Sequence, residues 1–386
     1  MTVFPLVRAY AGIRHRAVRT LFRAATGSRP YRQRANIVMI VALLAALIRT
    51  QASAESLTSN EAREKAYPSC YADTMLGQIV QLGIEHTIRE RYAIADSMFA
   101  ALSKQFPQSP IGPLFRAAVL QTRMIDREDG RQAEELQQLL DEAIDKSQQW
   151  RENAPGDPEP LFYQAVAYGY GAVHESHWGG WLAALKQGLK AANRFKEIIE
   201  LDPTFMDAYV GLGNYLYWKS AKMSFITWLP FVPDDREKGI AYLQRAAEKG
   251  VFAAQTARTS LMWAYLDFGL PNKTLELAEQ LHQEYPESKV FWWGIGLASY
   301  ESYRWRECIA AFDSLETRYS AEGPGNYFNL IMCAYYKAKA AHAAGDFARC
   351  REECRKAFAD LPPTETTRRL KGKLGELEEM YRRLNR

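Results

Sequence analysis

Two histidines and a glutamate occur in a stretch that suggests metal chemistry, His174-Glu175-Ser176-His177. The helical zinc-protease motif needs two histidines four residues apart, so that both reach the ion from one helical face. Here the histidines are three apart, and no third ligand stands near them in the sequence. We therefore predict no bound metal and no cofactor, and a zinc hydrolase using His174, Glu175 and His177 is kept only as a third alternative.

Glycine pairs occur at 211–213 (Gly-Leu-Gly) and 294–296 (Gly-Ile-Gly). A phosphate-binding loop needs such glycines directly after a strand, and neither pair follows one. Both pairs fall inside predicted helices, so we interpret them as points of close helix packing.

The five cysteines and the other potential nucleophiles do not form a catalytic set. Cys308, Cys350 and Cys354 fall at predicted core positions, whereas Cys70 and Cys333 have no evident partner. We expect buried, apolar thiols rather than disulfides, because bridge geometry is poor between residues one helical turn apart. No serine or cysteine stands beside a base, so the sequence predicts a protein that is not an enzyme.

Charge is unevenly distributed along the 386 residues. The formal net charge is +4, but residues 1–54 contain nine arginines and no lysine or acidic residue. Removing these nine from the 49 basic residues leaves 40 against 45 acidic ones, a net charge of −5 for the rest. A chain of that sign is not expected to bind nucleic acid, which requires a basic face.

The arginine-rich leader precedes an uncharged apolar run, residues 37–48, and an Ala-Ser-Ala triplet at 52–54. This order is typical of a secretory signal peptide, and twelve apolar residues are fewer than the roughly 20 that span a bilayer. We predict export to the periplasm or cell envelope, with cleavage after Ala54. The alternative is an inner-membrane anchor formed by residues 37–48, with the body outside the cytoplasm.

A spacing of 34 residues separates Tyr285-Pro286 from Tyr319-Ser320. Between these dipeptides, tryptophan, apolar, glycine, small and aromatic residues recur in a fixed order, at Trp292, Ile295, Gly296, Cys308, Phe312 and Leu315. This pattern resembles the tetratricopeptide repeat (TPR) family. Similar windows end at Pro107, Pro203 and Pro362, and proline stops a helix because it cannot continue the hydrogen-bond ladder.

Hairpins of this kind bury their apolar faces only by stacking, so the resemblance implies an all-α fold. We expect an α-solenoid of about six to seven TPR-like helical hairpins with a C-terminal capping helix. The predicted divisions are a signal peptide or anchor (1–54), a short linker (55–74), the solenoid (75–362) and the capping helix (363–386). Insertions relative to the repeat are expected at 174–181 and 218–233, both rich in aromatic residues.

A second, fainter similarity involves the segment Asp234–Ile240. It is similar to the Gly-Asp-Arg-x-x-Gly-Leu region of the tetratricopeptide-39 and Iml2-like outer-membrane group, over about residues 206–285. Asp234 replaces the glycine of that pattern.

In TPR proteins the concave surface is lined by fixed positions of the first helix of each hairpin. Carried over to this sequence, these positions predict a binding groove at Asn214, Tyr217, Trp218, Trp263, Trp293, Tyr300 and Tyr335. Aromatic rings offer a large contact area at low entropic cost. The leading hypothesis is therefore a non-catalytic exported scaffold that binds a protein or peptide. The alternative is a carrier for a small hydrophobic ligand, held in a pocket that the insertions close.

Overall fold

The computed structural model describes residues 67–223, 233–359 and 364–385. The chain divides into two compact units, Met1–Ala62 and Arg63–Arg386, and the described residues all belong to the second. The predictions for the leader 1–54, for most of the linker and for residues 224–232 of the second insertion lie outside the described residues. None of the described helices is long and apolar enough to cross a lipid bilayer.

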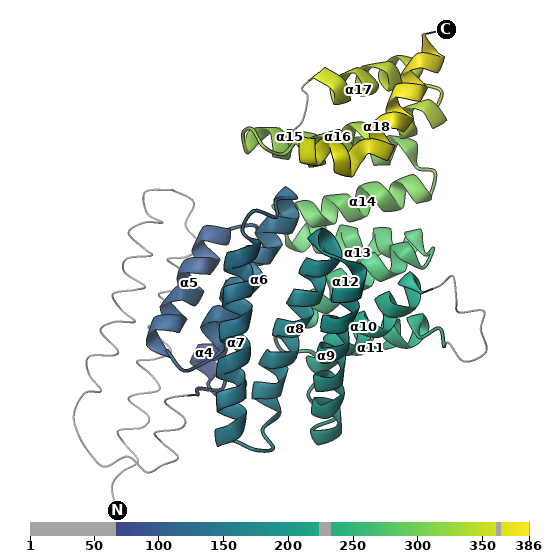
Figure 1. The fold of residues 1–386 in the computed structure, drawn as a ribbon. Helices are drawn as coiled ribbons and strands as arrows, with labels where there is room; N and C mark the ends of the chain where they lie inside the picture. Colours follow the sequence, from purple (N-terminus) through teal and green to yellow (C-terminus); the bar gives the residue numbers. More distant parts are fainter. Residues whose placement is uncertain (1–66, 224–232, 360–363, 386) are drawn as a thin grey trace, which may run out of the picture. The chain divides into compact units, whose positions relative to one another are not determined.

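The described residues form helices that succeed one another in sequence order, without strands (Figure 1). The first helices of the hairpins are α4 (Thr74–Ile88), α6 (Ile111–Arg127), α8 (Pro158–Trp178), α10 (Ala208–Lys222), α12 (Ala254–Asp267), α14 (Lys289–Glu301) and α16 (Tyr327–Ala343). The second helices are α5 (Tyr92–Gln105), α7 (Ala133–Asn153), α9 (Trp181–Leu201), α11 (Arg236–Lys249), α13 (Pro271–Glu284), α15 (Trp305–Ala321) and α17 (Phe347–Ala359).

Each helix packs on the next along the chain, and several first helices also pack on the first helix of the following hairpin, as α6 does on α8. The last helix, α18 (Thr364–Leu384), covers α16 and α17. This arrangement confirms the predicted all-α solenoid.

Small residues and aromatic rings set the spacing within hairpins. A Cβ atom added at Gly83 of α4 would lie 2.3 Å from the ring of Phe99 in α5, and one at Gly296 would lie 2.8 Å from Phe312. Each ring therefore occupies space that only a glycine leaves free. α13 ends at Glu284, before Pro286, as the proline signal predicts.

The connection expected at residues 174–181 is mostly helical. α8 continues to Trp178 and α9 begins at Trp181, so two glycines alone separate them. The N–H of Gly179 donates to the carbonyl oxygen of Glu175, which extends the hydrogen-bond ladder of α8 to its end. The insertion expected at 174–181 therefore does not form a long loop: the extra residues lengthen both helices of the hairpin to 21 residues each.

α4 lies along the loops that lead into α10, α12 and α14. Just before α4, the ring of Tyr71 packs 4.8 Å from the rings of Phe205 and Phe252. Farther along, Gln81 donates to the carbonyl of Val251, and Arg89 pairs with Glu287 at 2.9 Å. The first hairpin therefore contacts hairpins that are distant in sequence, in addition to its neighbour.

Asp207 holds one of these distant contacts together. Its buried carboxylate accepts hydrogen bonds from the Tyr71 hydroxyl at 2.7 Å and from the N–H groups of Val251 and Phe252 at 2.7 and 2.9 Å. We expect Asp207→Ala to lower the free energy of unfolding by about 2–3 kcal/mol, because it leaves these donors without their acceptor. Urea denaturation checks this, and the matched control is Asp202→Ala, whose carboxylate accepts from the N–H and hydroxyl of exposed Thr204.

Candidate functional site

The seven residues predicted to line a groove lie on four first helices, α10, α12, α14 and α16. Tyr217 is fully buried, and its hydroxyl lies 2.8 Å from the carbonyl oxygen of Ala264 and 2.8 Å from Asp267. Tyr335 is also buried, and its hydroxyl donates to Glu376 of the capping helix at 2.5 Å. In this structure both tyrosines therefore pack within the fold and present no ring to a partner.

Two more of the seven use their polar atoms inside the fold. The amide nitrogen of Asn214 donates to Val210 at 3.1 Å and to Ser260 at 3.0 Å. The indole N–H of Trp293 donates to the hydroxyl of Tyr319 at 2.9 Å. These side chains link neighbouring helices, so their N–H groups are already engaged within the fold.

The remaining three, Trp218, Trp263 and Tyr300, are half-buried. Trp218 lies edge-on to the ring of Tyr217, with 5.0 Å between ring centroids. Tyr300 lies between Trp305 and Tyr336, at centroid distances of 5.5 and 5.6 Å. Binding through these rings stays a prediction.

The histidines considered for zinc both lie beside an indole. The rings of His174 and His177 are each 5.3 Å from the ring of Trp178. Within the described ranges, the group of three potential ligand atoms close enough to hold a metal contains neither histidine. The glycine pairs 211–213 and 294–296 lie inside α10 and α14, as expected. The five cysteines are free and buried, which also agrees with the expectation.

The metal-compatible group consists of Glu90, Asp126 and Glu322. The ammonium of Lys289 lies among these carboxylates, paired with all three and 3.2 Å from Asp126. Lys289 is 3% exposed, so it supplies the positive charge that these carboxylates need. This cluster, called the Lys289 junction below, joins α4 and α6 to α14 and α15.

Glu159 is another buried carboxyl group, and it is a candidate for acid–base catalysis. It is 5% exposed and accepts from the N–H of Cys70 at 2.9 Å and from the hydroxyl of Tyr163 at 2.5 Å. Burial raises the pKa of Glu159 to about 7, although these hydrogen bonds oppose the shift. It borders a cleft of about 340 Å³, but no serine, cysteine or histidine is among the residues that line this cleft. The carboxyl is thus placed to hold the chain before α4 against α8.

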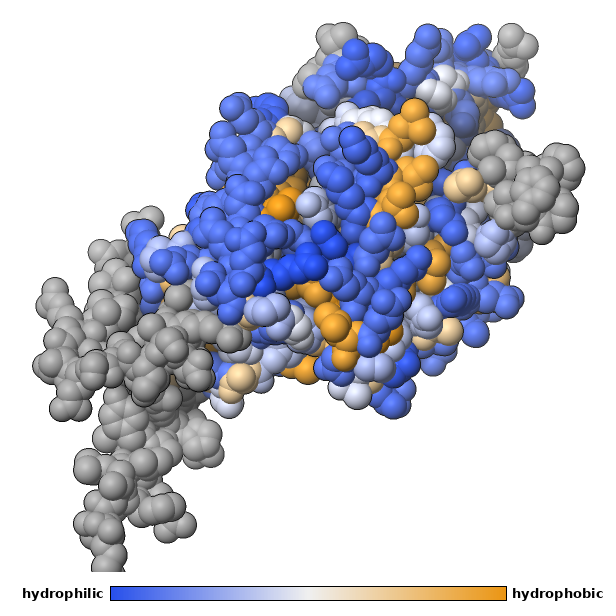
Figure 2. Space-filling view, turned by 60° about the horizontal axis from the view of Figure 1, so that its bottom comes forward, coloured by the Kyte–Doolittle hydropathy of each residue, from blue (hydrophilic) through white to orange (hydrophobic). Residues whose placement is uncertain are grey.

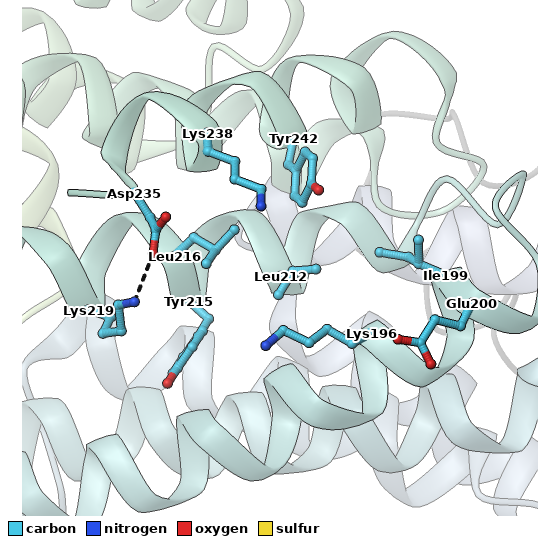
Figure 3. A pocket seen from close by; sticks show the side chains of 10 residues that line it. All are labelled: Lys196, Ile199, Glu200, Leu212, Tyr215, Leu216, Lys219, Asp235, Lys238 and Tyr242. Carbon is cyan, nitrogen blue, oxygen red and sulfur yellow. Dashed lines mark hydrogen bonds and ion pairs between the residues drawn. The ribbon is translucent and has the colours of Figure 1, made fainter. Parts of the chain in front are cut away.

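A different cleft, of about 400 Å³, lies between α9 and α11 with α10 as its floor (Figure 3). The floor is formed by Leu212, Tyr215, Leu216 and Lys219, whose spacing puts them on one face of α10. α9 contributes the apolar Ile199 at one wall. This surface is called the α9–α11 cleft below.

The α9–α11 cleft carries more lysines than carboxylates. Lys219 pairs with Asp235 at 2.9 Å. Lys196 of α9 and Lys238 of α11 extend their amines toward the middle of the cleft (Figure 3), and neither pairs with a carboxylate among the described residues. Lys238 lies over the ring of Tyr242, with its amine 5.8 Å from the ring centroid. The cleft therefore combines two leucines and two tyrosines with two lysines that form no ion pair among the described residues, and Glu200 and Asp235 are the carboxylates of its lining.

Sequence reasoning missed this cleft. One part of it was detectable in the sequence: the residues from Leu212 to Lys219 that form the floor recur at helical spacing, which indicates that they share one face of a helix. The walls come from α9 and α11, and the distance between those helices depends on packing that one sequence does not specify. On the face that Figure 2 presents, apolar side chains surface as separate strips among hydrophilic ones.

No family model matches this sequence, and no curated protein matches it either. Among solved structures, a tetratricopeptide repeat protein from Parabacteroides merdae is similar with a TM-score of 0.35 and 13% sequence identity. The alignment covers 80% of this chain and 98% of that one.

Proposed function

We propose that this protein is a non-catalytic, exported scaffold of TPR-like type that binds a protein or peptide. The observation that carries the proposal is the α9–α11 cleft, a groove between helices that has leucines in its floor and, at its walls, two lysines without an ion pair among the described residues. Solenoids present such extended surfaces for recognition. Export rests on the arginine-rich leader and the apolar run 37–48.

The geometry favours this cleft over the predicted inner groove. Of the inner residues, Tyr217 and Tyr335 are buried, and the polar atoms of Asn214 and Trp293 are already hydrogen-bonded within the fold. A partner at the inner face would have to compete with these bonds. At the α9–α11 cleft, a partner would gain contacts with Lys196 and Lys238 without breaking an ion pair that either lysine makes with another described residue.

The chemistry of the cleft indicates what it binds. The leucines of the floor can contact apolar side chains, and the two lysines can pair with acidic groups. About 400 Å³ accommodates a few side chains of an extended segment. We therefore expect a peptide segment in which apolar and acidic residues stand close together. A carrier for a small hydrophobic ligand stays the alternative, and it requires closure by an insertion that lies mostly outside the described residues.

Reversing the two uncommitted charges tests the proposal. We expect Lys196→Glu/Lys238→Glu to weaken partner binding by about 10- to 100-fold, because two negative charges would then face the acidic groups of the partner. The matched control is Lys186→Glu/Lys190→Glu, which changes two exposed lysines of α9 outside the cleft. Partners recovered from cell-envelope extracts are quantified for each variant.

A third variant, Trp263→Ala/Trp293→Ala, reports on the inner face. Loss of binding in this variant together with full binding in the charge-reversed one would move the site to the inner groove. Partner recovery that neither pair of substitutions changes would refute both binding surfaces.

A further inference from the structure

Three sulfur-containing side chains lie in one cluster where the capping helix covers the last hairpin. Cys350 and Cys354 stand one turn apart on α17, and both are fully buried. Met380 of α18 approaches from the other side, with its Sδ 3.1 Å from the Sγ of Cys350. The surrounding side chains are apolar and include Ala338, Ala341 and Leu377, so sulfur is the main donor type at this position.

The turn of α17 that carries the two thiols is tied to α18 at a second point. Arg351 donates to the carbonyl oxygen of Leu384 at 3.2 Å, at the end of α18. Both thiols and the thioether therefore lie at one contact between α17 and α18.

We propose that Cys350, Cys354 and Met380 bind one soft monovalent metal ion, Cu(I), independently of the peptide-binding function. Thiolates and thioethers are the ligands that Cu(I) prefers. Zn²⁺ fits less well, since its structural sites use four ligands drawn from cysteine, histidine and carboxylate, and methionine is not among them. Binding releases one proton from each thiol and needs no change of oxidation state, because the ion enters as Cu(I).

For Cys350 and Met380, 3.1 Å apart, the required rearrangement is small. Metal–sulfur bonds of about 2.3 Å in a trigonal site place the sulfur atoms about 4 Å from one another. Met380 must therefore move back by about 1 Å, and its unbranched, flexible side chain can do so without moving the helix. The other three cysteines lie elsewhere: Cys70 packs in the core of the first hairpins, and Cys308 and Cys333 pack in the cluster around Phe312.

Anaerobic titration of the full chain with Cu(I), against a chromogenic Cu(I) chelator, tests the site. We expect one tightly bound ion per chain and release of two protons per ion. Met380→Leu preserves side-chain volume, and we expect it to weaken binding by about 10- to 100-fold. We expect Cys350→Ala/Cys354→Ala to abolish the tight site. Cys308→Ala removes an equally buried thiol from another part of the core and is the matched control, with binding unchanged.

X-ray absorption of the copper-loaded chain should show three sulfur neighbours, falling to two in Met380→Leu. If the double cysteine variant does not fold, the methionine variant decides alone. Equal affinity in wild type and Met380→Leu, with two sulfur neighbours in both, would overturn the three-sulfur site. Loss of the tight ion in Cys308→Ala would also overturn it.

Discussion

Replacing Lys289 with methionine is expected to lower the free energy of unfolding by about 3–5 kcal/mol. Methionine fills a similar volume but leaves Glu90, Asp126 and Glu322 without the ammonium that lies among them. Removing one partner from a buried ion pair costs more than the pair itself contributes, because the remaining charges stay out of water. Lys289→Met should therefore be among the most damaging substitutions of a charged residue in this chain.

Urea denaturation followed by circular dichroism measures this loss. The matched control is Arg355→Met, which breaks an exposed pair with Glu352 on one helix and should change stability by about 0.5 kcal/mol or less. Adding Glu90→Gln to Lys289→Met should restore part of the stability, since it removes one of the orphaned charges. A loss below about 1 kcal/mol in Lys289→Met would show that the carboxylates reach water or bind another cation.

The Lys289 junction also predicts a pH dependence. Burial and the negative charge of Asp126 raise the pKa of Glu90 to about 7, although Lys289 opposes the shift. Burial likewise raises the pKa of Asp126. A carboxyl whose pKa is higher in the folded chain takes up a proton on folding, so its contribution to stability declines as pH rises from about 4.5 to 7. Lys289→Met should accordingly lose more stability relative to wild type at pH 8 than at pH 5.5.

Because the Lys289 junction joins hairpins that are distant in sequence, the loss of stability should extend beyond neighbouring hairpins. A solenoid is stabilised mainly by contacts between neighbouring hairpins, so local damage usually stays local. The Lys289 junction instead connects the first hairpins with α14 and α15, and nearby contacts follow the same route. Asn329 donates to the carbonyl of Asp126 at 2.8 Å, and Arg91 pairs with Glu287 at 2.8 Å. Hydrogen exchange in Lys289→Met should therefore accelerate in α4 and α6 as well as in α14.

The repeat frame could be predicted because it depends on local rules. Gly83 and Phe99, or Gly296 and Phe312, are separated by a fixed interval within one hairpin, and their packing follows from that interval. The Lys289 junction could not be predicted in this way. Glu90 and Lys289 are 199 residues apart, and the curvature that brings them together is the sum of small rotations between successive hairpins.

The candidate site shows the same limit. Spacing correctly placed Tyr217 and Tyr335 on first helices, but it does not tell whether another helix covers them. Tyr335 is covered by α18 through Glu376, and Tyr217 reaches Asp267 of α12. The α9–α11 cleft needs side chains from three helices at once, so its shape appears only when their packing is known.

Replacing Lys337 with methionine is the second substitution for which we expect a loss of about 3–5 kcal/mol. Lys337 lies in α16 with a fully buried side chain, and its ammonium pairs with Glu316 at 2.6 Å, Glu353 at 2.9 Å and Asp313 at 3.2 Å. Burial alone would lower the pKa of Lys337, but the carboxylates outweigh it and raise the pKa. The lysine is therefore held charged in the core between α15, α16 and α17.

The three carboxylates should not be destabilised equally when the ammonium of Lys337 is removed. Asp313 keeps its pair with Arg349 at 2.5 Å, whereas Glu353 is 2% exposed and retains only longer contacts with Arg349 and Lys356, at 3.8 and 3.4 Å. Lys337→Met/Glu353→Gln should therefore recover more stability than Lys337→Met/Asp313→Asn. Equal recovery in the two double variants would contradict the inference that Glu353 depends on Lys337 more than Asp313 does.

Hydrogen exchange distinguishes this substitution from the one at Lys289. All partners of Lys337 belong to α15 and α17, which flank α16 in the sequence, so the damage should follow the nearest-neighbour rule of a solenoid. We expect faster exchange in α15 to α18 and unchanged exchange in α4 to α6. Faster exchange in the first hairpins would contradict this expectation. It would mean that the C-terminal hairpins stabilise the first ones through the Lys289 junction, whose Glu322 lies between α15 and α16.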